Sequence, residues 1–533
     1  MRNLLARRFR ADQRGNVAML TTLAIVPLTI ASMGAVDLTH GMAARVELQD
    51  ALDAAALAAG RSGAADNATL QKTGQRLLQQ NLADASDLTL AASSFKLGDS
   101  GQVVASATVT YASTFAAMSG HPGEASASTE VTRANSMLEI ALVLDNTGSM
   151  DDTLGSGDKK IALLRTAAAN FVDTMAAAAK SSSVSDSIKI SLVPFSNTVK
   201  VGANYKTATW LDQAGVASIN NEIFTKKKGV TQAANRFTLF DNLGTTWGGC
   251  VENRKAPYDI QDTAPSTSAP DTLFTPFFAP DEADNVKDWR GDKADNDYVK
   301  DPTKENNVTL DQWGKQGSIL KYTKANKTVT TLDATIGPNS GCGMQAIQRL
   351  TTDFAGLKAA IGQMVAVGDT NIPMGLVWGW HTLSPNAPFA DGVDYLAAKH
   401  KKIVVLMTDG QNTMSNNSYI FDKSHYSGNG YIWQGRILKD NNPLTPVNDV
   451  NSSDSDRTAA MDDRLKRLCN NMKATSVGIE IYTIGVGVTT SSRALLKSCA
   501  TDANHYFDVT TGTALNPTFL SIANQIAQLH LSK

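Results

Sequence analysis

The stretch Glu139-Ile140-Ala141-Leu142-Val143-Leu144-Asp145-Asn146-Thr147-Gly148-Ser149-Met150 decides the predicted fold of most of this chain. It places five apolar residues in a row, Ile140–Leu144, before an aspartate and a turn that contains glycine. An unbroken apolar run is typical of a central strand in a parallel sheet, because both faces of that strand are covered. Further runs of this kind follow at Ile188–Val193, Ile403–Met407, Ile479–Val486 and Tyr506–Val509.

The segments between these runs show helical spacing. Strands that alternate with helices predict an α/β fold with a doubly wound, mostly parallel sheet and right-handed crossovers. Ligands of such sheets bind at the carboxyl ends of the strands, so the loops there are the candidate functional loops. The residues that mark two helical faces are Ile161, Leu164, Ala168, Phe171, Val172 and Met175, and then Met461, Leu465, Leu468 and Met472.

Three of these loops carry side chains with oxygen atoms. Asp145, Thr147 and Ser149 follow the first strand at two-residue steps, and Asp409 follows the strand that ends at Met407. Between them in sequence, Thr370 stands at the start of a predicted helix. Carboxylates and hydroxyls suit Mg²⁺, which prefers oxygen ligands and retains some of its waters. An open coordination position on such an ion would attract an acidic side chain from a partner.

The three loops resemble the von Willebrand factor A family, whose metal-ion-dependent adhesion site combines D-x-S-x-S, a threonine and a T-D-G loop in this chain order. The resemblance covers Met137 to about Val201, and Met344–Lys533. In the family's D-x-S-x-S, Thr147 replaces the first serine, which keeps the hydroxyl and adds a methyl group. The resemblance implies that Mg²⁺, or another divalent cation, is held by Asp145, Thr147, Ser149, Thr370 and Asp409.

The N-terminus combines a basic leader with an apolar segment. Residues 1–15 contain five arginines and one aspartate, and Val17–Val36 contains no charge. As a helix, that run spans about 30 Å, the hydrocarbon thickness of a bilayer. We therefore predict a cytoplasmic leader at 1–15, a transmembrane helix at 16–36 and, by the positive-inside rule, an extracytoplasmic remainder. The alternative is a cleaved signal peptide with its cleavage site near Ser32-Met33-Gly34.

Residues 37–136 are predicted to form a small α+β stalk. Apolar residues at three- and four-residue steps continue the first helix to Ala59, and a second helix is expected near Leu70–Leu82. Alternation predicts strands at Val103–Tyr111 and around Ala125–Val131. A long helix that starts in the membrane and ends against a small sheet is the layout of pilin-like subunits.

This region resembles the TadE/TadG-like proteins of the tight-adherence, or Tad/Flp, pilus system. The resemblance rests on Arg14–Ala18, Ala35–Leu38 and Leu48–Leu57. Combined with the adhesion-type domain, it implies a TadG-like pilus assembly protein whose partners are other pilus assembly or pilin-like proteins. Leu20 stands where pseudopilin relatives carry a glutamate, five residues after the cleavage glycine, Gly15. This departure favours a permanent anchor in the inner membrane, with most of the chain in the periplasm.

Two insertions interrupt the α/β pattern of the domain at 137–533. The first, 202–343, has no clear periodicity and could be a partner-binding lobe or a cap; it contains Trp210, Trp247, Trp289 and Trp313. The second, 415–456, follows the Asp409 loop. Four cysteines allow three pairings, and nearness in sequence favours Cys250–Cys342, across the first insertion, and Cys469–Cys499, between two helices.

Composition and motifs argue against several function classes. The chain has 533 residues and a net charge of −2, so no overall basic field exists for nucleic acid. The turn after the first strand echoes the D-K-T-G of aspartyl-phosphate enzymes, but Asn146 stands in place of the lysine, and the sequence has no P-loop. We predict a non-enzymatic, membrane-anchored protein for pilus assembly or anchoring, which recognises an acidic side chain through its metal site. The alternative is a surface adhesin that contacts host or matrix directly.

Overall fold

The computed structural model of the chain describes residues 14–62, 66–83, 85, 87–98, 102–113, 121–131, 136–155, 157–180, 182, 184–224, 234–284, 296–417, 420–437 and 452–531. Most of the predicted leader, Trp289 and parts of both insertions lie outside these residues. The chain divides into two compact units, each described by itself. The first comprises Met1–Asn135, Lys180–Ser185 and Gln528–Lys533, and the second Ser136–Ala179 and Asp186–Ala527.

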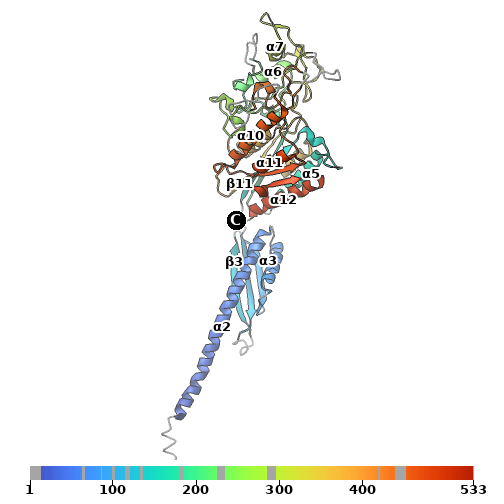
Figure 1. The fold of residues 1–533 in the computed structure, drawn as a ribbon. Helices are drawn as coiled ribbons and strands as arrows, with labels where there is room; N and C mark the ends of the chain where they lie inside the picture. The colour runs from blue at the N-terminus through green and yellow to red at the C-terminus, as the bar shows by residue number, and fades with distance from the viewer. Residues whose placement is uncertain are drawn as a thin grey trace, which may run out of the picture. The chain divides into compact units, whose positions relative to one another are not determined.

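The first unit packs two helices against a small antiparallel sheet (Figure 1). Its helices are α2 (Arg14–Arg61) and α3 (Asn67–Asn81). Its strands, in the order β1-β2-β3, are β1 (Leu88–Leu97), β2 (Val103–Tyr111) and β3 (Gly123–Val131). The two predicted strands correspond to β2 and β3. β1 lacks a clean alternation of buried and exposed residues and has a register shift at Leu90/Ala92, which explains why its sequence gave no strand signal.

Helix α2 has two parts with opposite environments. Its C-terminal part is buried against α3 and the sheet through Leu48, Leu52 and Ala55. Its N-terminal part exposes large apolar side chains. Among the described residues, α2 is the one helix that is long and apolar enough to cross a membrane, over Met19–Gly60. The hydroxyls of Thr29 and Ser32 bond to carbonyls of the preceding turn, which satisfies them within the helix. Between Met19 and Ile30, the exposed large apolar residues are Met19, Leu20, Leu23, Ile25, Val26, Leu28 and Ile30.

The second unit is built on an eight-stranded sheet in the order β13-β12-β11-β4-β5-β6-β7, with β10 also paired to β5. The chain enters at the central strand, adds β5 on one side, and later returns to add β11, β12 and β13 on the other. All of these pairings are parallel, and those of β6, β7 and β10 are antiparallel. The predicted doubly wound, mostly parallel sheet is therefore present. The strands are β4 (Met137–Asp145), β5 (Ile188–Phe195), β6 (Val199–Lys200), β7 (Cys250–Val251), β10 (Gln348–Thr351), β11 (His400–Thr408), β12 (Glu480–Val486) and β13 (Tyr506–Val509).

Helices cover both faces of this sheet, which is why its strands read as unbroken apolar runs. Ile140, Leu142 and Leu144 of β4 face a core formed with α5 (Lys160–Lys180), α8 (Phe354–Gly362) and α12 (Gly512–Leu531). Ala141 and Val143 face a second core formed with α9 (Ile372–Leu383), α10 (Asp454–Lys473) and α11 (Thr490–Cys499).

The first insertion shares this second core. Its described part contains α6 (Arg236–Leu243), β7, the two-stranded pair β8 (Lys304–Glu305) and β9 (Val308–Thr309), and α7 (Gln312–Gly317). Aromatic side chains such as Trp210, Phe224 and Phe274 belong to the same buried cluster as Phe195 and Trp378 of the sheet domain. These side chains, and the pairing of β7 with β6, make the insertion part of the second unit.

Candidate metal centre

Asp145 ends β4 and is buried at the carboxyl edge of the sheet. Its Oδ1 accepts a hydrogen bond from the Thr147 N–H at 2.8 Å, and its Oδ2 accepts one from the Thr408 hydroxyl at 2.6 Å. β11 pairs with β4 in parallel register, Met407 opposite Leu144, so the residues that follow these two strands meet at one edge. The register of two neighbouring strands thus brings the Asp145 loop to the Asp409 loop.

The turn after β4 directs two hydroxyls toward the second carboxylate. Thr147 Oγ1 lies 3.1 Å from Ser149 Oγ, and Ser149 Oγ donates to Asp409 Oδ1 at 2.8 Å. Gly148 donates its N–H to the carbonyl of Gly368 at 2.9 Å, and a Cβ atom on Gly148 would lie 3.4 Å from that carbonyl oxygen. The turn therefore packs backbone against backbone on the third loop.

Thr370 lies in that third loop, just before α9. Its N–H donates to the hydroxyl of Thr413 at 2.8 Å, and the Thr413 N–H donates back to the Thr370 carbonyl at 2.8 Å. A Cβ atom on Gly410 would lie 3.8 Å from Thr370 Oγ1 and 3.9 Å from Ser149 Oγ, so the two hydroxyls flank this glycine. Hydrogen bonds thus link Asp145, Thr147, Ser149 and Asp409 of the predicted set, and Thr370 stands beside them.

Sequence reasoning missed two further residues of the centre, Lys160 and Thr408. Lys160 is the first residue of α5, and its Nζ lies 2.7 Å from Asp409 Oδ2 and 3.3 Å from the Ser149 carbonyl. The only signal in the sequence was that Lys160 directly precedes Ile161, where the apolar face of the helix begins. Thr408 belongs to the T-D-G loop, and its hydroxyl donates a hydrogen bond to the buried carboxylate of Asp145.

The centre contains more negative than positive charge. Burial and, after it, the charge of Asp409 raise the pKa of Asp145 above its ordinary value, and the hydrogen bonds from Thr147 and Thr408 offset only part of this effect. The lysine contacts Asp409 and leaves Asp145 with neutral donors. An added cation would offset the negative charge of the centre and favour the ionised form of Asp145.

The residues present fit a hard divalent cation. Two carboxylates and three hydroxyls from three loops supply oxygen donors, which Mg²⁺ prefers, and the hydroxyls leave the ion most of its charge. Within the described ranges, no three His, Cys, Asp or Glu side chains form a group that could hold a metal, so a nitrogen or sulfur site of the zinc type is not found there. Bound at this edge, the ion would supply a Lewis-acidic position for a carboxylate.

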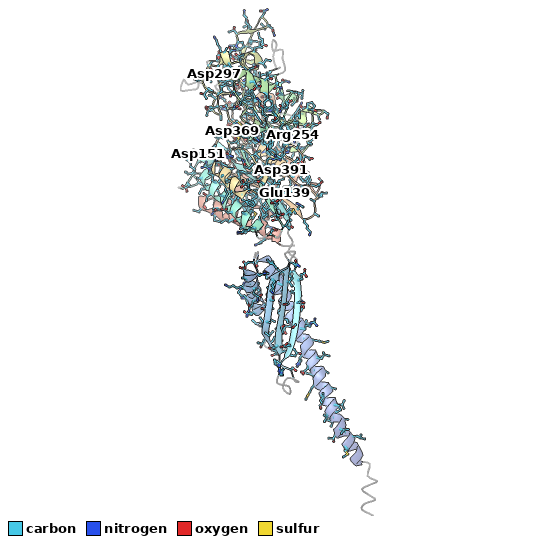
Figure 2. All side chains as sticks on the ribbon, turned by 180° about the vertical axis from the view of Figure 1, so that it is seen from behind. Glu139, Asp151, Arg254, Asp297, Asp369 and Asp391 are labelled. Atoms are coloured by element: carbon cyan, nitrogen blue, oxygen red, sulfur yellow. A yellow bond between two sulfur atoms is a disulfide. The ribbon has the colours of Figure 1, made fainter. Side chains whose placement is uncertain are left out.

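A cavity of about 250 Å³ adjoins the third loop. It is lined by Gly368 and Asp369, by residues of both insertions such as Glu282 and Tyr426, and by Asn197. Asp369 accepts two hydrogen bonds of 3.0 Å from Ser415, so the second insertion is fixed to the loop that carries Thr370. In Figure 2, Asp369, which lies in this loop, and Asp151, which ends the turn after β4, lie above Glu139, near the start of β4.

The four cysteines form two disulfides in the second unit. Cys250 pairs with Cys342, with Cα atoms 5.8 Å apart, and Cys469 pairs with Cys499, with Cα atoms 5.2 Å apart. The first closes the first insertion on itself, and the second joins α10 to α11. Both pairings are the ones that nearness in sequence favoured.

A second polar cluster, around Asp262, has the composition of a hydrolase triad but a different geometry. Ser384 Oγ donates to Asp262 Oδ2 at 2.7 Å, and His381 Nδ1 lies 3.4 Å from Asp262 Oδ1. Neither nitrogen of His381 has a hydrogen-bond partner among the described residues. The serine therefore bonds to the carboxylate, where a triad needs a serine bonded to the histidine base.

Comparisons with solved structures find matches of low sequence identity. The chain resembles, in its fold, the pilus adhesin SpaC from Lactobacillus rhamnosus GG, at 12% identity and a TM-score of 0.34, over 83% of this chain and 34% of that one. It also resembles the PilB minor pilin from Streptococcus sanguinis, at 13% identity and a TM-score of 0.31, over 83% and 78%. A third structure is the vWF domain of the type V pili tip protein Mfa5 from Porphyromonas gingivalis, at 12% identity and a TM-score of 0.31, over 75% and 97%.

The sequence comparisons match a shorter part of the chain than the structure comparisons do. No curated protein matches the chain. The Tad family model, described as Flp pilus-assembly TadE/G-like, matches residues 15–66, which include the apolar part of α2 and its buried continuation. Residues 15–66 are therefore similar to the TadE/G-like family of the Flp pilus-assembly type.

Proposed function

We propose that this protein is a membrane-anchored, non-enzymatic assembly or anchoring factor of a Tad/Flp-type pilus, which recognises a partner through a metal-ion-dependent adhesion site. The TadE/G-like match over residues 15–66 supports the link to the pilus. The single candidate membrane span within the described helices supports a single-pass anchor. The arginine-rich residues before the span favour a cytoplasmic N-terminus, with most of the chain on the periplasmic side of the inner membrane.

The observation that carries the recognition step is the chain of hydrogen bonds from Asp145 through Thr147 and Ser149 to Asp409. Asp145, Thr147, Ser149, Thr370 and Asp409 would hold Mg²⁺ or a similar cation. The protein's own groups supply few charges and several neutral hydroxyls, so the ion keeps its attraction for an outside carboxylate. The partner is then another pilus component that presents an acidic side chain.

A metal titration tests the site. In the full chain purified in detergent, MgCl₂ should raise the melting temperature, and Asp145→Ala should abolish this rise because it removes the buried carboxylate of the set. Asp151→Ala is the matched control, since Asp151 follows the same turn, is exposed and pairs with exposed Lys159. An Asp145→Ala protein that keeps the full response to Mg²⁺ would overturn the metal site.

Cell fractionation tests the location. We expect the protein in the inner membrane with an N-terminus upstream of the apolar run, and protease added to spheroplasts should digest the second unit. A mature N-terminus near Ala35 would contradict the anchor. Recovery of the protein at the cell surface would favour the adhesin alternative, because an inner-membrane protein cannot itself reach a distant surface.

A further inference from the structure

Lys160 is a largely buried residue of the candidate metal centre rather than a surface lysine. Its Nζ contacts Asp409 Oδ2 at 2.7 Å and the Ser149 carbonyl at 3.3 Å, and these two residues belong to two different loops of the site. The Asp409 side chain is fully buried and that of Lys160 is 12% exposed. The adjacent lysine, Lys159, is 55% exposed and pairs with Asp151 outside the centre.

The local backbone holds Lys160 in this position. Thr153 forms a bridge with Lys159, and the Lys160 N–H donates a hydrogen bond of 2.9 Å to the Asp152 carbonyl. This places a lysine at the N-terminal residue of α5, where the helix dipole disfavours a positive charge. The ion pair with Asp409 offsets that cost, so this interaction within the centre stabilises a lysine at this position.

The charges of the centre depend on this lysine. With both carboxylates ionised, Asp145, Asp409 and Lys160 together leave one negative charge. A divalent cation converts this to one positive charge, and a carboxylate from a partner then neutralises it. Without Lys160, the loaded centre would already be neutral, and a partner's carboxylate would leave it negative.

We propose, on the basis of the function proposed above, that Lys160 lowers the affinity of the empty centre for the metal ion and raises the affinity of the metal-loaded centre for a partner's carboxylate. Its ammonium repels the incoming cation and weakens binding of the metal alone. The same charge makes the loaded centre cationic, so that the loaded centre favours an anionic group and disfavours a neutral one. Metal and carboxylate therefore bind cooperatively, and the metal is held most tightly when the partner is present.

The experiment compares Lys160→Met with Lys159→Met in the full chain in detergent. Isothermal titration with MgCl₂ gives the affinity for the metal, and titration of the Mg²⁺-saturated protein with sodium acetate gives the affinity for a carboxylate probe. We expect Lys160→Met to bind Mg²⁺ about tenfold more tightly and to bind acetate about tenfold more weakly than the wild type, because one unit charge a few ångströms away has changed. Lys159→Met should match the wild type in both titrations.

Lys160→Arg keeps the charge and should retain the wild-type affinities, which separates charge from loss of packing. Unchanged Mg²⁺ affinity in Lys160→Met, with a wild type that binds Mg²⁺, would overturn this inference and leave the proposed function intact. A lower melting temperature in chelator with unchanged affinities would also overturn it, since Lys160 would then be only structural. Mg²⁺ binding by Lys160→Met alone would support the antagonism between lysine and metal but would overturn the proposed function. Absence of Mg²⁺ binding in both proteins would overturn both.

Discussion

Two clusters of the second unit contain the same charges, two aspartates and one lysine, in different arrangements. In the insertion cluster, Lys321 Nζ lies 2.8 Å from Asp281 Oδ2 and 3.1 Å from Asp301 Oδ1, so one ammonium bridges both carboxylates. In the site cluster, formed by Asp145, Asp409 and Lys160, the ammonium contacts Asp409, and Asp145 accepts hydrogen bonds from neutral groups. The position of the lysine, rather than the composition, distinguishes the two clusters.

The hydrogen bonds to the aspartates of the insertion cluster add to this difference from the site cluster. Asp281 Oδ1 accepts the N–H groups of Tyr298 and Val299 at 2.6 and 2.7 Å. Burial raises the pKa of Asp281 to about 7. Burial alone would lower the pKa of Lys321, but the nearby Asp281, Tyr322 and Asp301 together raise it above its ordinary value. The backbone N–H donors on Asp281 favour its ionised form. In the insertion cluster the lysine thus contacts both carboxylates, whereas in the site cluster it contacts only Asp409 and Asp145 accepts hydrogen bonds from neutral groups.

The largest expected effect comes from breaking the insertion cluster. Lys321→Met should lower the free energy of unfolding by about 3–5 kcal/mol, because two buried carboxylates lose their shared counter-ion. Urea unfolding of the full chain measures this loss. Lys324→Met, at an exposed position of the same segment, is the control and should stay within about 0.5 kcal/mol of the wild type. A Lys321→Met protein as stable as this control would show that the bridging ammonium is dispensable.

Removing a charge from the site cluster should have the opposite sign. In chelator, Asp145→Asn should be more stable than the wild type by about 1–2 kcal/mol, because the repulsion with Asp409 is removed while the amide oxygen still accepts the Thr147 N–H. With MgCl₂ this advantage should disappear. Asp281→Asn should instead be destabilised under both conditions. If Asp145→Asn is destabilised in chelator as much as Asp281→Asn, the two clusters do not differ as described.

A third buried arrangement places His381 beside Asp262, and there the histidine is kept neutral. Burial lowers the pKa of His381 despite the nearby carboxylate of Asp262. The unfolded chain then binds the proton more readily, so this residue's contribution to stability is complete above its ordinary pKa of 6.5 and is lost as the pH falls below that value. Between pH 7.5 and 5.5 the wild type should lose about 1 kcal/mol more than His381→Gln in urea unfolding. Parallel pH dependences would contradict a neutral buried His381.

The smallest effect is expected from Thr147→Ser, which removes a methyl group and keeps the hydroxyl next to Ser149. Its Mg²⁺ affinity should stay within about threefold of the wild type, a difference of less than about 1 kcal/mol. Thr147→Val, which keeps the shape and removes the hydroxyl, should weaken Mg²⁺ binding further. Equal affinities for Thr147→Val and the wild type would remove this hydroxyl from the proposed ligand set.

The central part of the fold could be predicted because its signals are local. The run Ile140–Leu144 must be a strand covered on both faces, and the oxygen-bearing residues that follow it must lie at the carboxyl edge. β10 could not be predicted, because a four-residue antiparallel strand has no pattern of its own. The place of the first insertion in the core was also out of reach, since residues such as Phe224 acquire partners only through contacts distant in sequence.

The same distinction applies to the site. Asp145, Thr147 and Ser149 share one turn, and parallel register brings Asp409 to them, so residue type and topology were enough. Lys160 is brought to the centre by the bridge between Thr153 and Lys159 and by its own backbone bond to Asp152, which no periodicity in the sequence indicates. Its contact with Asp409 spans 249 residues in sequence and depends on the conformation of a long side chain.

The position of β4 has a mechanical consequence. Covalently, its amino end follows the segment that leads from the first unit, and its carboxyl end carries Asp145. If a partner holds the metal centre while the membrane holds α2, tension enters one end of β4 and leaves at the other. Because Asp409, which follows β11, also belongs to the centre, part of this load would pass from β4 to β11. It would load the parallel ladder from His400↔Met137 to Met407↔Leu144 in shear, with its hydrogen bonds sharing the force at once.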